Sequence, residues 1–439
     1  MNTKQNISVI GGGLAGCEAA WQLAEAGFPV TIYEMKPVKF TPAHHYKGLA
    51  ELVCSNSLKA DRLASAAGLL KAEMERMGSL LIPCARKVSV PAGGALAVDR
   101  ELFSDMVTEK IKSHPLISIS SEEVSKLPES PAIIASGPLT AAGLAKSIEE
   151  KCGQRLSFFD AAAPIVTYDS LDKDITFFAS RYGRGDADYI NCPMNKEEYL
   201  EFYNALINAE RAELSEFDKE IFRVYEGCMP IEVLASRGED TMRFGPLKPV
   251  GLTDPRTDRR PYAVVQLRRE NSHGTLFNLV GFQTNLKFAE QKRVFSMIPG
   301  LKNAEFMRYG VMHRNSFLDS PRLLNADYSL RNDPLMFFAG QITGVEGYIE
   351  SAASGILAGK NLARKLSGKE QLVLPRETMM GALAAYISDK NVSEFQPMGC
   401  NMGILPDLPE RIRDKKVKYQ AYADRALTAL EEYLSVNER

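Results

Sequence analysis

The chain has 439 residues, a length at which one hydrophobic core seldom suffices, so we expect two domains or one large domain with an insertion. Its 53 lysines and arginines against 55 aspartates and glutamates give a net charge of −2, which excludes a globally basic nucleic-acid-binding surface. No apolar run is long enough to cross a bilayer, and the first expected strand starts too close to Met1 for a secretory signal to precede it. We therefore expect a cytoplasmic protein with no membrane attachment.

A dinucleotide-binding fingerprint lies near the N-terminus. Residues 7–10 predict a strand and residues 17–24 predict a helix, with a glycine-rich turn between them. The first glycine permits a tight turn, the second lets the backbone approach a pyrophosphate, and the third lets helix and strand pack closely. A second predicted strand, residues 30–33, ends at Glu34, where a carboxylate accepts hydrogen bonds from a ribose. The turn, which predicts binding of a flavin or nicotinamide dinucleotide, consists of Gly11, Gly12, Gly13, Leu14, Ala15 and Gly16.

From residue 1 to residue 192, short apolar runs alternate with helical patterns, as in a doubly wound, mostly parallel α/β sheet. Residues 91–100 lead into a helix expected over residues 101–112. Residues 132–138 predict a buried strand followed by a glycine turn. Such strand-to-helix joints are where a doubly wound sheet binds its ligand. The candidate ligand contacts at these joints are Asp99, Arg100 and Gly137.

The pattern changes over residues 193–300, where a helix around residues 197–210 and later strands predict an inserted, smaller α/β domain. Residues 301–439 return to the first pattern, with a strand over residues 335–341 and a helix over residues 350–364. The joint between that strand and that helix presents backbone N–H groups and the positive end of a helix dipole to a ligand. Its candidate ligand contacts are Gly340, Gln341 and Gly347.

Two of the seven cysteines stand in loop sequences that favour a reactive thiol. Cys54 lies among short polar residues, and Cys228 lies between a glycine and a nearby proline. Free cysteines are more often small buried hydrophobes, and spacing alone leaves that alternative open for both. No cysteine pair has the C-x-x-C spacing of a redox site, and the adjacent His44 and His45 lack the spacing of helical metal ligands, so we expect no metal.

Eight segments carry a more specific pattern: residues 41–45, 51–58, 91–100, 161–166, 226–232, 244–251, 308–315 and 338–355. Together they resemble the folate- and FAD-dependent tRNA (uracil-5-)-methyltransferase family. The match runs from the N-terminus to about residue 363 and is more diffuse beyond it. The cysteine-containing segments are specific to this family, whereas the segments around the glycine-rich turn are shared with its larger relative, the carboxymethylaminomethyl-uridine tRNA-modification flavoprotein.

The resemblance implies a Rossmann-like FAD-binding domain in two parts, residues 1–192 and 301–439, with residues 193–300 inserted. FAD would be held by the ligand contacts named above, with 5,10-methylenetetrahydrofolate and NADPH or NADH as co-substrates and the T-arm of tRNA as substrate. The family assigns the nucleophile that adds to uracil C6 to the cysteine matching Cys228. It places the cysteine matching Cys54 beside the flavin, as a general base or as the partner of a flavin-bound methylene.

Three alternatives remain: the larger uridine-modifying flavoprotein, the same chemistry on ribosomal RNA, and a flavin-bearing RNA-binding protein without methyl transfer. Chain length and the Cys54 segment disfavour the first. Because the net charge does not attract RNA, docking requires a local basic surface, which we expect from Arg181, Arg184 and the region of Lys415 and Lys416. The sequence holds no second glycine-rich fingerprint, so a nicotinamide cofactor is expected to dock only transiently.

Overall fold

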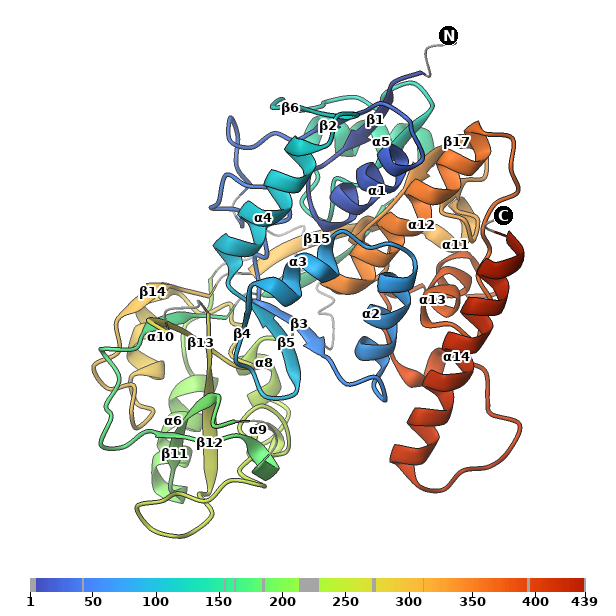
Figure 1. The fold of residues 1–439 in the computed structure, drawn as a ribbon. Helices are drawn as coiled ribbons and strands as arrows, with labels where there is room; N and C mark the ends of the chain where they lie inside the picture. Colours follow the sequence, from blue (N-terminus) through green and yellow to red (C-terminus); the bar gives the residue numbers. More distant parts are fainter. Residues whose placement is uncertain are drawn as a thin grey trace.

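A computed structural model describes residues 5–41, 43–153, 155–161, 163–183, 186–212, 229–270, 274–310, 312–392 and 395–437. Its first sheet has six strands in the order β16-β17-β7-β1-β2-β6 (Figure 1). The five strands from β17 to β6 are parallel, and β16 closes one edge antiparallel. The predicted α/β fold with a mostly parallel sheet is therefore confirmed. The bounds are β1 (Ile7–Ile10), β2 (Val30–Tyr33), β6 (Ile117–Ser120), β7 (Ala132–Ile134), β16 (Ser329–Leu330) and β17 (Asp333–Phe338).

Two helices that are far apart in sequence, α1 (Leu14–Glu25) and α12 (Tyr348–Leu366), lie side by side against this sheet (Figure 1). Their backbones approach closely because α12 has glycines on the facing side. A β-carbon at Gly355 would overlap the carbonyl oxygen of Ala15, and one at Gly359 would overlap that of Ala19. The packing aligns the N-termini of both helices at the carboxyl edge of the sheet.

A second six-stranded sheet, at the lower left of Figure 1, has the order β10-β11-β12-β13-β9-β14, and all its pairings are antiparallel. The expected boundary between residues 192 and 193 falls inside β11, which pairs with β12 along its whole length. Because β9 and β14 also belong to this sheet, we propose that the second domain spans residues 163–310 rather than 193–300. Its strands are β9 (Ile165–Thr167), β10 (Phe177–Phe178), β11 (Tyr189–Met194), β12 (Ala263–Arg269), β13 (Leu276–Leu279) and β14 (Phe306–Arg308), and its helices are α6 (Lys196–Ile207), α8 (Ile231–Ala235), α9 (Thr241–Phe244) and α10 (Phe288–Phe295).

The chain leaves and re-enters the first domain through the antiparallel pair β8 (Arg155–Ala161) and β15 (Met312–Leu318). A small sheet of β3 (Ser57–Ala60), β5 (Ala95–Val98) and β4 (Ser89–Val90) lies between the two domains (Figure 1). Within the described residues, no helix is both long and apolar enough to span a bilayer. The remaining helices are α2 (Ala66–Arg76), α3 (Leu81–Lys87), α4 (Arg100–Ser113), α5 (Ala142–Cys152), α11 (Ser320–Leu323), α13 (Met379–Ser388) and α14 (Lys415–Asn437).

The close approach of α1 and α12 can be tested at Gly355. Gly355→Val should lower the free energy of unfolding by about 1–3 kcal/mol, because its branched side chain forces α12 away from Ala15. Urea-induced unfolding followed by circular dichroism measures the loss. Lys360→Val in the same helix is the control, with an expected loss of at most about 0.7 kcal/mol from helix propensity. Equal losses in the two variants would contradict the packing argument.

Candidate functional site

A cavity of about 440 Å3 opens at the carboxyl ends of β1, β2, β7 and β17, where a doubly wound sheet binds its ligand. Most of the predicted contacts line it, including one of the two candidate cysteines. Gly16, Asp99 and Arg100 lie outside the lining, and Cys228 lies outside the described residues. The predicted residues that line the cavity are Gly11, Gly12, Gly13, Leu14, Ala15, Glu34, Cys54, Gly137, Gly340, Gln341 and Gly347.

The three fingerprint glycines differ in what surrounds them. Gly11 has φ +104°, and a β-carbon there would overlap the carbonyl oxygen of Ala135 on the neighbouring strand. At Gly16 a β-carbon would overlap the carbonyl oxygen of Gly11, so α1 could not pack against β1. At Gly13, by contrast, no atom of the described residues lies within 4 Å of a β-carbon position. Gly13 therefore leaves open space on the cavity side, where a pyrophosphate can approach the backbone.

The N-termini of α1 and α12 lie at the cavity without a side-chain cap among the described residues. Gly13 is the N-cap of α1 and Gly347 is the N-cap of α12. Uncapped N-terminal N–H groups and the helix dipole favour an anionic or electron-rich group. Beside Gly347, Nε2 of Gln341 donates to Oε2 of Glu346 at 2.6 Å, which fixes the loop between β17 and α12.

Glu34 is held in place by its own strand end and by the glycine turn. The backbone N–H of Gly12 donates to Oε2 at 2.8 Å, and that of Lys36 donates to Oε1 at 3.0 Å. The carboxylate therefore faces the cavity in a fixed orientation and retains lone pairs for the hydroxyls of a ribose.

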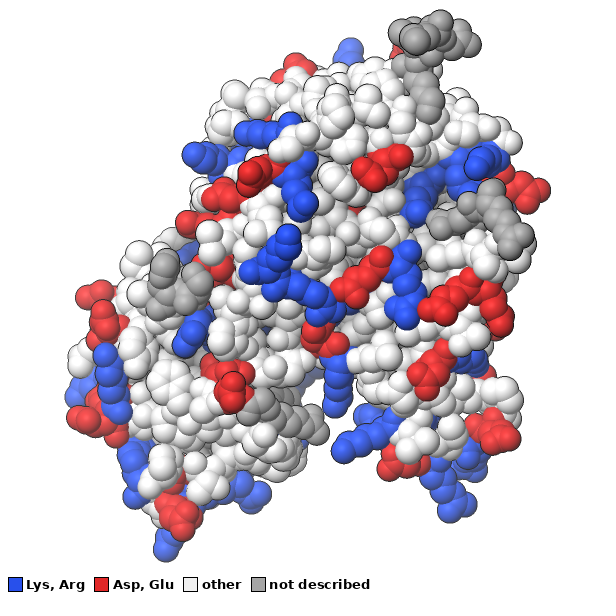
Figure 2. Space-filling model, in the orientation of Figure 1, with Lys and Arg blue, Asp and Glu red and all other residues white. Residues whose placement is uncertain are grey.

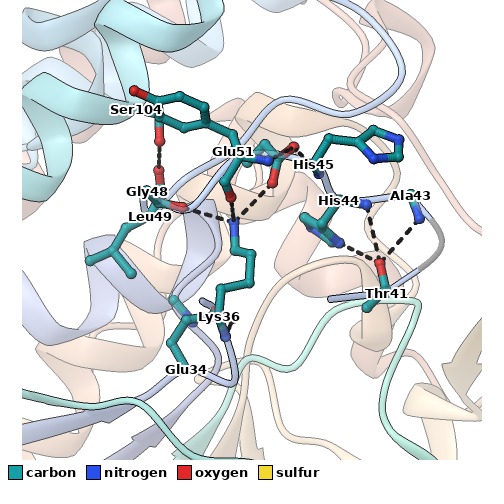
Figure 3. A network of polar contacts seen from close by, with 12 residues as sticks. Glu34, Lys36, Thr41, Ala43, His44, His45, Gly48, Leu49, Glu51 and Ser104 are labelled. Carbon is teal, nitrogen blue, oxygen red and sulfur yellow. Dashed lines mark hydrogen bonds and ion pairs between the residues drawn. The ribbon is translucent and has the colours of Figure 1, made fainter. Parts of the chain in front are cut away.

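The buried side chain of Lys36 fastens the loop that follows Glu34 (Figure 3). Its Nζ donates to the carbonyl oxygens of Tyr46 (3.1 Å) and Gly48 (2.8 Å) and forms an ion pair with Oε2 of Glu51 at 2.9 Å. No sequence pattern indicates this role, because a single lysine after an acidic residue can form a buried ion pair or remain a solvated charge.

His44, on the same loop, lines the cavity beside Thr41 (Figure 3). Its Nδ1 lies 2.6 Å from Oγ1 of Thr41. Burial lowers the pKa of His44, so the imidazole is neutral at pH 7 and offers the cavity an uncharged hydrogen-bonding ring. No cluster of metal-ligating side chains is found in the part of the chain that the structure describes.

Cys54 is half-buried at the cavity wall and contacts Tyr348 at the start of α12. The Tyr348 hydroxyl lies 2.9 Å from Sγ of Cys54 and accepts hydrogen bonds from the backbone N–H groups of Cys54 (2.8 Å) and Ser55 (3.3 Å). Sequence analysis did not single out Tyr348, because its partner is almost three hundred residues away and only the fold brings them together.

The predicted contacts Asp99 and Arg100 have structural partners. Asp99 caps α4, where its carboxylate accepts from the backbone N–H of Leu102 at 3.2 Å. Nη1 of Arg100 donates to the carbonyl oxygen of Val53 at 3.2 Å, and Nε forms an ion pair with Glu270 at 2.7 Å. The contact of Arg100 with Val53 orients the segment that carries Cys54. A direct contact of Asp99 or Arg100 with the ligand stays a prediction.

Cys228 lies outside the described residues, but the chain that follows it approaches the same cavity. The backbone N–H of Ile231 donates to the carbonyl oxygen of Gln283 at 2.7 Å. Gln283 belongs to the second domain and lines the cavity. The second domain thus contributes to the wall of a site otherwise built by the first.

The expected RNA-binding role of Arg181 is not supported by its contacts. Its Nη2 donates to the carbonyl oxygen of Lys248 at 2.7 Å, and burial lowers its pKa, so this guanidinium fastens a loop of the second domain. Arg184 lies outside the described residues. Lys415 and Lys416 are exposed at the start of α14. The face of the molecule drawn in Figure 2 is hollowed between the second domain and the C-terminal helices, and lysine and arginine side chains project into the hollow.

Comparison with known proteins agrees with this architecture. A family model described as "Glucose inhibited division protein A" matches residues 6–370. The chain is 58% identical over 431 residues to "Methylenetetrahydrofolate--tRNA-(uracil-5-)-methyltransferase TrmFO" of Acetivibrio thermocellus, with 98% of each chain covered. Its identity to the protein of the same name from Natranaerobius thermophilus is 59% over 430 residues, which covers 98% of this chain and 99% of the relative.

Among solved structures, GidA of Aquifex aeolicus superposes with a TM-score of 0.70 at 15% sequence identity, over 98% of this chain and 74% of that one. At this identity the likeness supports the fold alone. The family model and the relatives, in contrast, match most of the sequence. The chain therefore belongs to the GidA family and, within it, to the family of the methylenetetrahydrofolate--tRNA-(uracil-5-)-methyltransferases, as its sequence motifs predicted.

Proposed function

We propose that this protein is an FAD-dependent enzyme that methylates C5 of a uridine in the T-arm of tRNA, with the one-carbon unit taken from 5,10-methylenetetrahydrofolate. The observation that carries the proposal is that one cavity is lined both by the glycine turn of a dinucleotide fingerprint and by the thiol of Cys54. Family membership supplies the substrate class, since the relatives are named for a folate donor and a tRNA acceptor.

The residues present fit FAD. Gly13 leaves room for the pyrophosphate, Glu34 can accept hydrogen bonds from the ribose, and the N-terminus of α12 at Gly347 would contact the flavin half. When bound, FAD supplies a reducible ring that can receive the folate methylene and deliver it together with electrons. The protein itself binds, orients and desolvates the reacting groups.

Uracil C5 is a poor nucleophile until a thiolate adds to C6. In the proposed mechanism, Cys228 forms a carbon–sulfur bond to C6, and the electron pair of the C5–C6 double bond moves into the C4 carbonyl to give an enolate that is nucleophilic at C5. After C5 has formed a bond to the one-carbon unit, a base removes the C5 proton, a hydride equivalent reduces the methylene to methyl, and the Cys228 thiolate leaves. Cys54 is the proposed base, because its sulfur lies on the cavity wall. NADPH or NADH would supply the reducing equivalents by docking transiently.

Gly13→Val tests the cofactor site. The protein should fold, because the described residues leave a β-carbon at position 13 free space, but flavin should be lost, because the valine occupies the volume of the pyrophosphate. The flavin absorbance of the purified protein and its circular dichroism measure the two effects. Gly94→Val, at a position equally free of described neighbours but away from the cavity lining, should keep its flavin. A yellow Gly13→Val protein would contradict the assigned site.

The reaction is tested with undermodified tRNA, methylenetetrahydrofolate and NADPH, followed by nucleoside analysis. New 5-methyluridine in the T-arm is expected, and product in ribosomal RNA alone would move the proposal to that substrate. Cys228→Ala should retain flavin and form no product, because C5 is not activated. A denaturant-resistant adduct with a 5-fluorouridine-containing RNA should form in wild type and disappear in Cys228→Ala. If the adduct disappears only in Cys54→Ala, the roles of the cysteines are exchanged.

For RNA docking we expect the exposed lysines at the start of α14 to contact phosphate. Lys415→Ala combined with Lys416→Ala should weaken tRNA binding severalfold and lower the slope of log Kd against log salt concentration by about 1–2. The slope falls because binding with fewer phosphate contacts releases fewer counterions from the RNA. Lys110→Ala with Lys112→Ala, on the exposed side of α4, is the control and should leave the slope unchanged. An unaltered slope in the α14 variant would exclude that helix end from the interface.

A further inference from the structure

The hydroxyl of Tyr348 has three hydrogen-bonding neighbours. The backbone N–H groups of Cys54 and Ser55 donate to its oxygen, and together they occupy the two lone pairs. The hydroxyl proton then points to the third neighbour, Sγ of Cys54, at 2.9 Å. Burial raises the pKa of Tyr348 well above its ordinary value, so the hydroxyl keeps this proton. The Cys54 sulfur is therefore the acceptor in this hydrogen bond, which suits a thiolate better than a thiol.

Two arginines, Arg268 buried and Arg100 partly buried, hold the chain on either side of this sulfur. Nη1 of Arg100, from α4, donates to the carbonyl oxygen of Val53. Nη2 of Arg268, from β12 of the second domain, donates to Oγ of Ser55 at 2.7 Å. The backbone at Cys54 is thus clamped between the two domains by side chains that are positively charged at neutral pH.

Among the described residues, the buried charges near Cys54 do not cancel. Glu270 neutralises Arg100 through their ion pair, whereas Arg268 donates to neutral oxygens. Arg308, from β14, has Nε and Nη2 buried with no hydrogen-bond partner among the described residues. Burial and the nearby Arg100 lower the pKa of Arg308 to about 10, which still leaves it protonated at pH 7. A buried, unpaired guanidinium is costly unless an anion lies close to it.

We propose that Arg308 is a positioning residue for Cys54 and that, with the Tyr348 hydroxyl, it keeps the Cys54 thiol ionised at neutral pH. Each of the three arginines interacts electrostatically with Cys54. Since Tyr348 stays protonated, Cys54 is the group in this cluster that supplies the missing negative charge. The charged and titratable groups of the cluster are Tyr348 from α12, Arg100 from α4, Arg268 and Glu270 from β12 and its end, and Arg308 from β14.

The proposal deepens the proposed function, on which it rests in taking Cys54 as a reacting group. A thiolate can accept the C5 proton directly, whereas a thiol must first lose its own. The second domain, which supplies Arg268 and Arg308, would then set the reactivity of a sulfur carried by the first domain.

The test measures ionisation of Cys54 without RNA or folate. The flavin-containing protein is pulsed with iodoacetamide from pH 5.5 to pH 10, and the Cys54 peptide is quantified by mass spectrometry. In wild type, the alkylation rate should reach its half-maximum below about pH 7, against about 8.5 for an ordinary thiol. Arg308→Met should move the half-maximum up by at least about one pH unit, which is a tenfold loss of thiolate at neutral pH. Arg308→Lys should stay close to wild type, because it keeps the charge.

Arg293→Met is the matched control, since Arg293 lies in the same domain but is exposed and paired with Glu290. Its Cys54 titration should equal that of wild type. The Cys152 peptide reports unfolding in the same samples, because burial raises the pKa of that thiol to about 11 in the folded chain. If Arg308→Met unfolds, Tyr348→Phe decides instead, because it leaves the arginines in place and removes the hydrogen bond donated to Sγ together with the two that the hydroxyl accepts from the backbone. It should also raise the half-maximum.

A wild-type half-maximum near pH 8.5 would overturn the proposal. So would a folded Arg308→Met variant that titrates like wild type. Failure of the proposed function is distinguishable from failure of this inference: absence of 5-methyluridine with a low Cys54 half-maximum contradicts only the methylation chemistry. Methylation with an ordinary Cys54 titration contradicts only the role of Arg308.

Discussion

The backbone contact between α1 and α12 is the constraint on which the site depends. Gly355 and Gly359 let α12 approach α1 until backbone meets backbone, and larger residues at either position would separate the helices. With the helices in this register, Gly13 and Gly347 place two uncapped N-termini on one cavity. A dinucleotide needs both ends of its site at a fixed separation. Closely packed small residues hold two helices at a fixed distance more strictly than long side chains do, because small residues have few alternative rotamers.

A second constraint joins the domains at the thiol. Nδ2 of Asn56 donates to the carbonyl oxygens of Val98 in the first domain and Arg269 in the second, at 3.1 and 2.8 Å, and its Oδ1 accepts from Arg268 at 3.0 Å. The segment on either side of Cys54 is therefore shared between two bodies that have separate hydrophobic cores. A change in the position of the second domain relative to the first would disturb this segment, since the hydrogen bonds of Asn56 span the junction.

The sequence predicted the parts of the site that are local in the chain. The fingerprint glycines, Glu34 at its strand end and the second joint near Gly340 are each recognisable within a short window, and all but Gly16 line the cavity. The limits that we propose for the second domain differ from those predicted from the sequence, because short strands such as β9 resemble either sheet and only their pairing assigns them. Tyr348 and Arg308 lie in two of the segments that carry the family pattern, but their contacts could not be predicted, because the partners lie on other elements. The hydrogen bond from Arg181 to Lys248 could not be predicted, because glycines beside a basic residue do not reveal which way its guanidinium is turned.

The chain as a whole carries a net charge of −2, yet the walls around Cys54 are locally positive. Within the described part of the chain, enclosing three largely buried guanidinium groups with one carboxylate costs free energy, so the cluster is poorly explained as a device for stability. It is better explained by what it surrounds: a sulfur that is more useful as an anion and a hydroxyl that has its proton directed at that sulfur. Because Arg268 and Arg308 come from the second domain, the proposed ionisation of the Cys54 thiol depends on how the second domain is attached to the first. A substrate that binds across the junction can therefore influence the chemistry without touching Cys54.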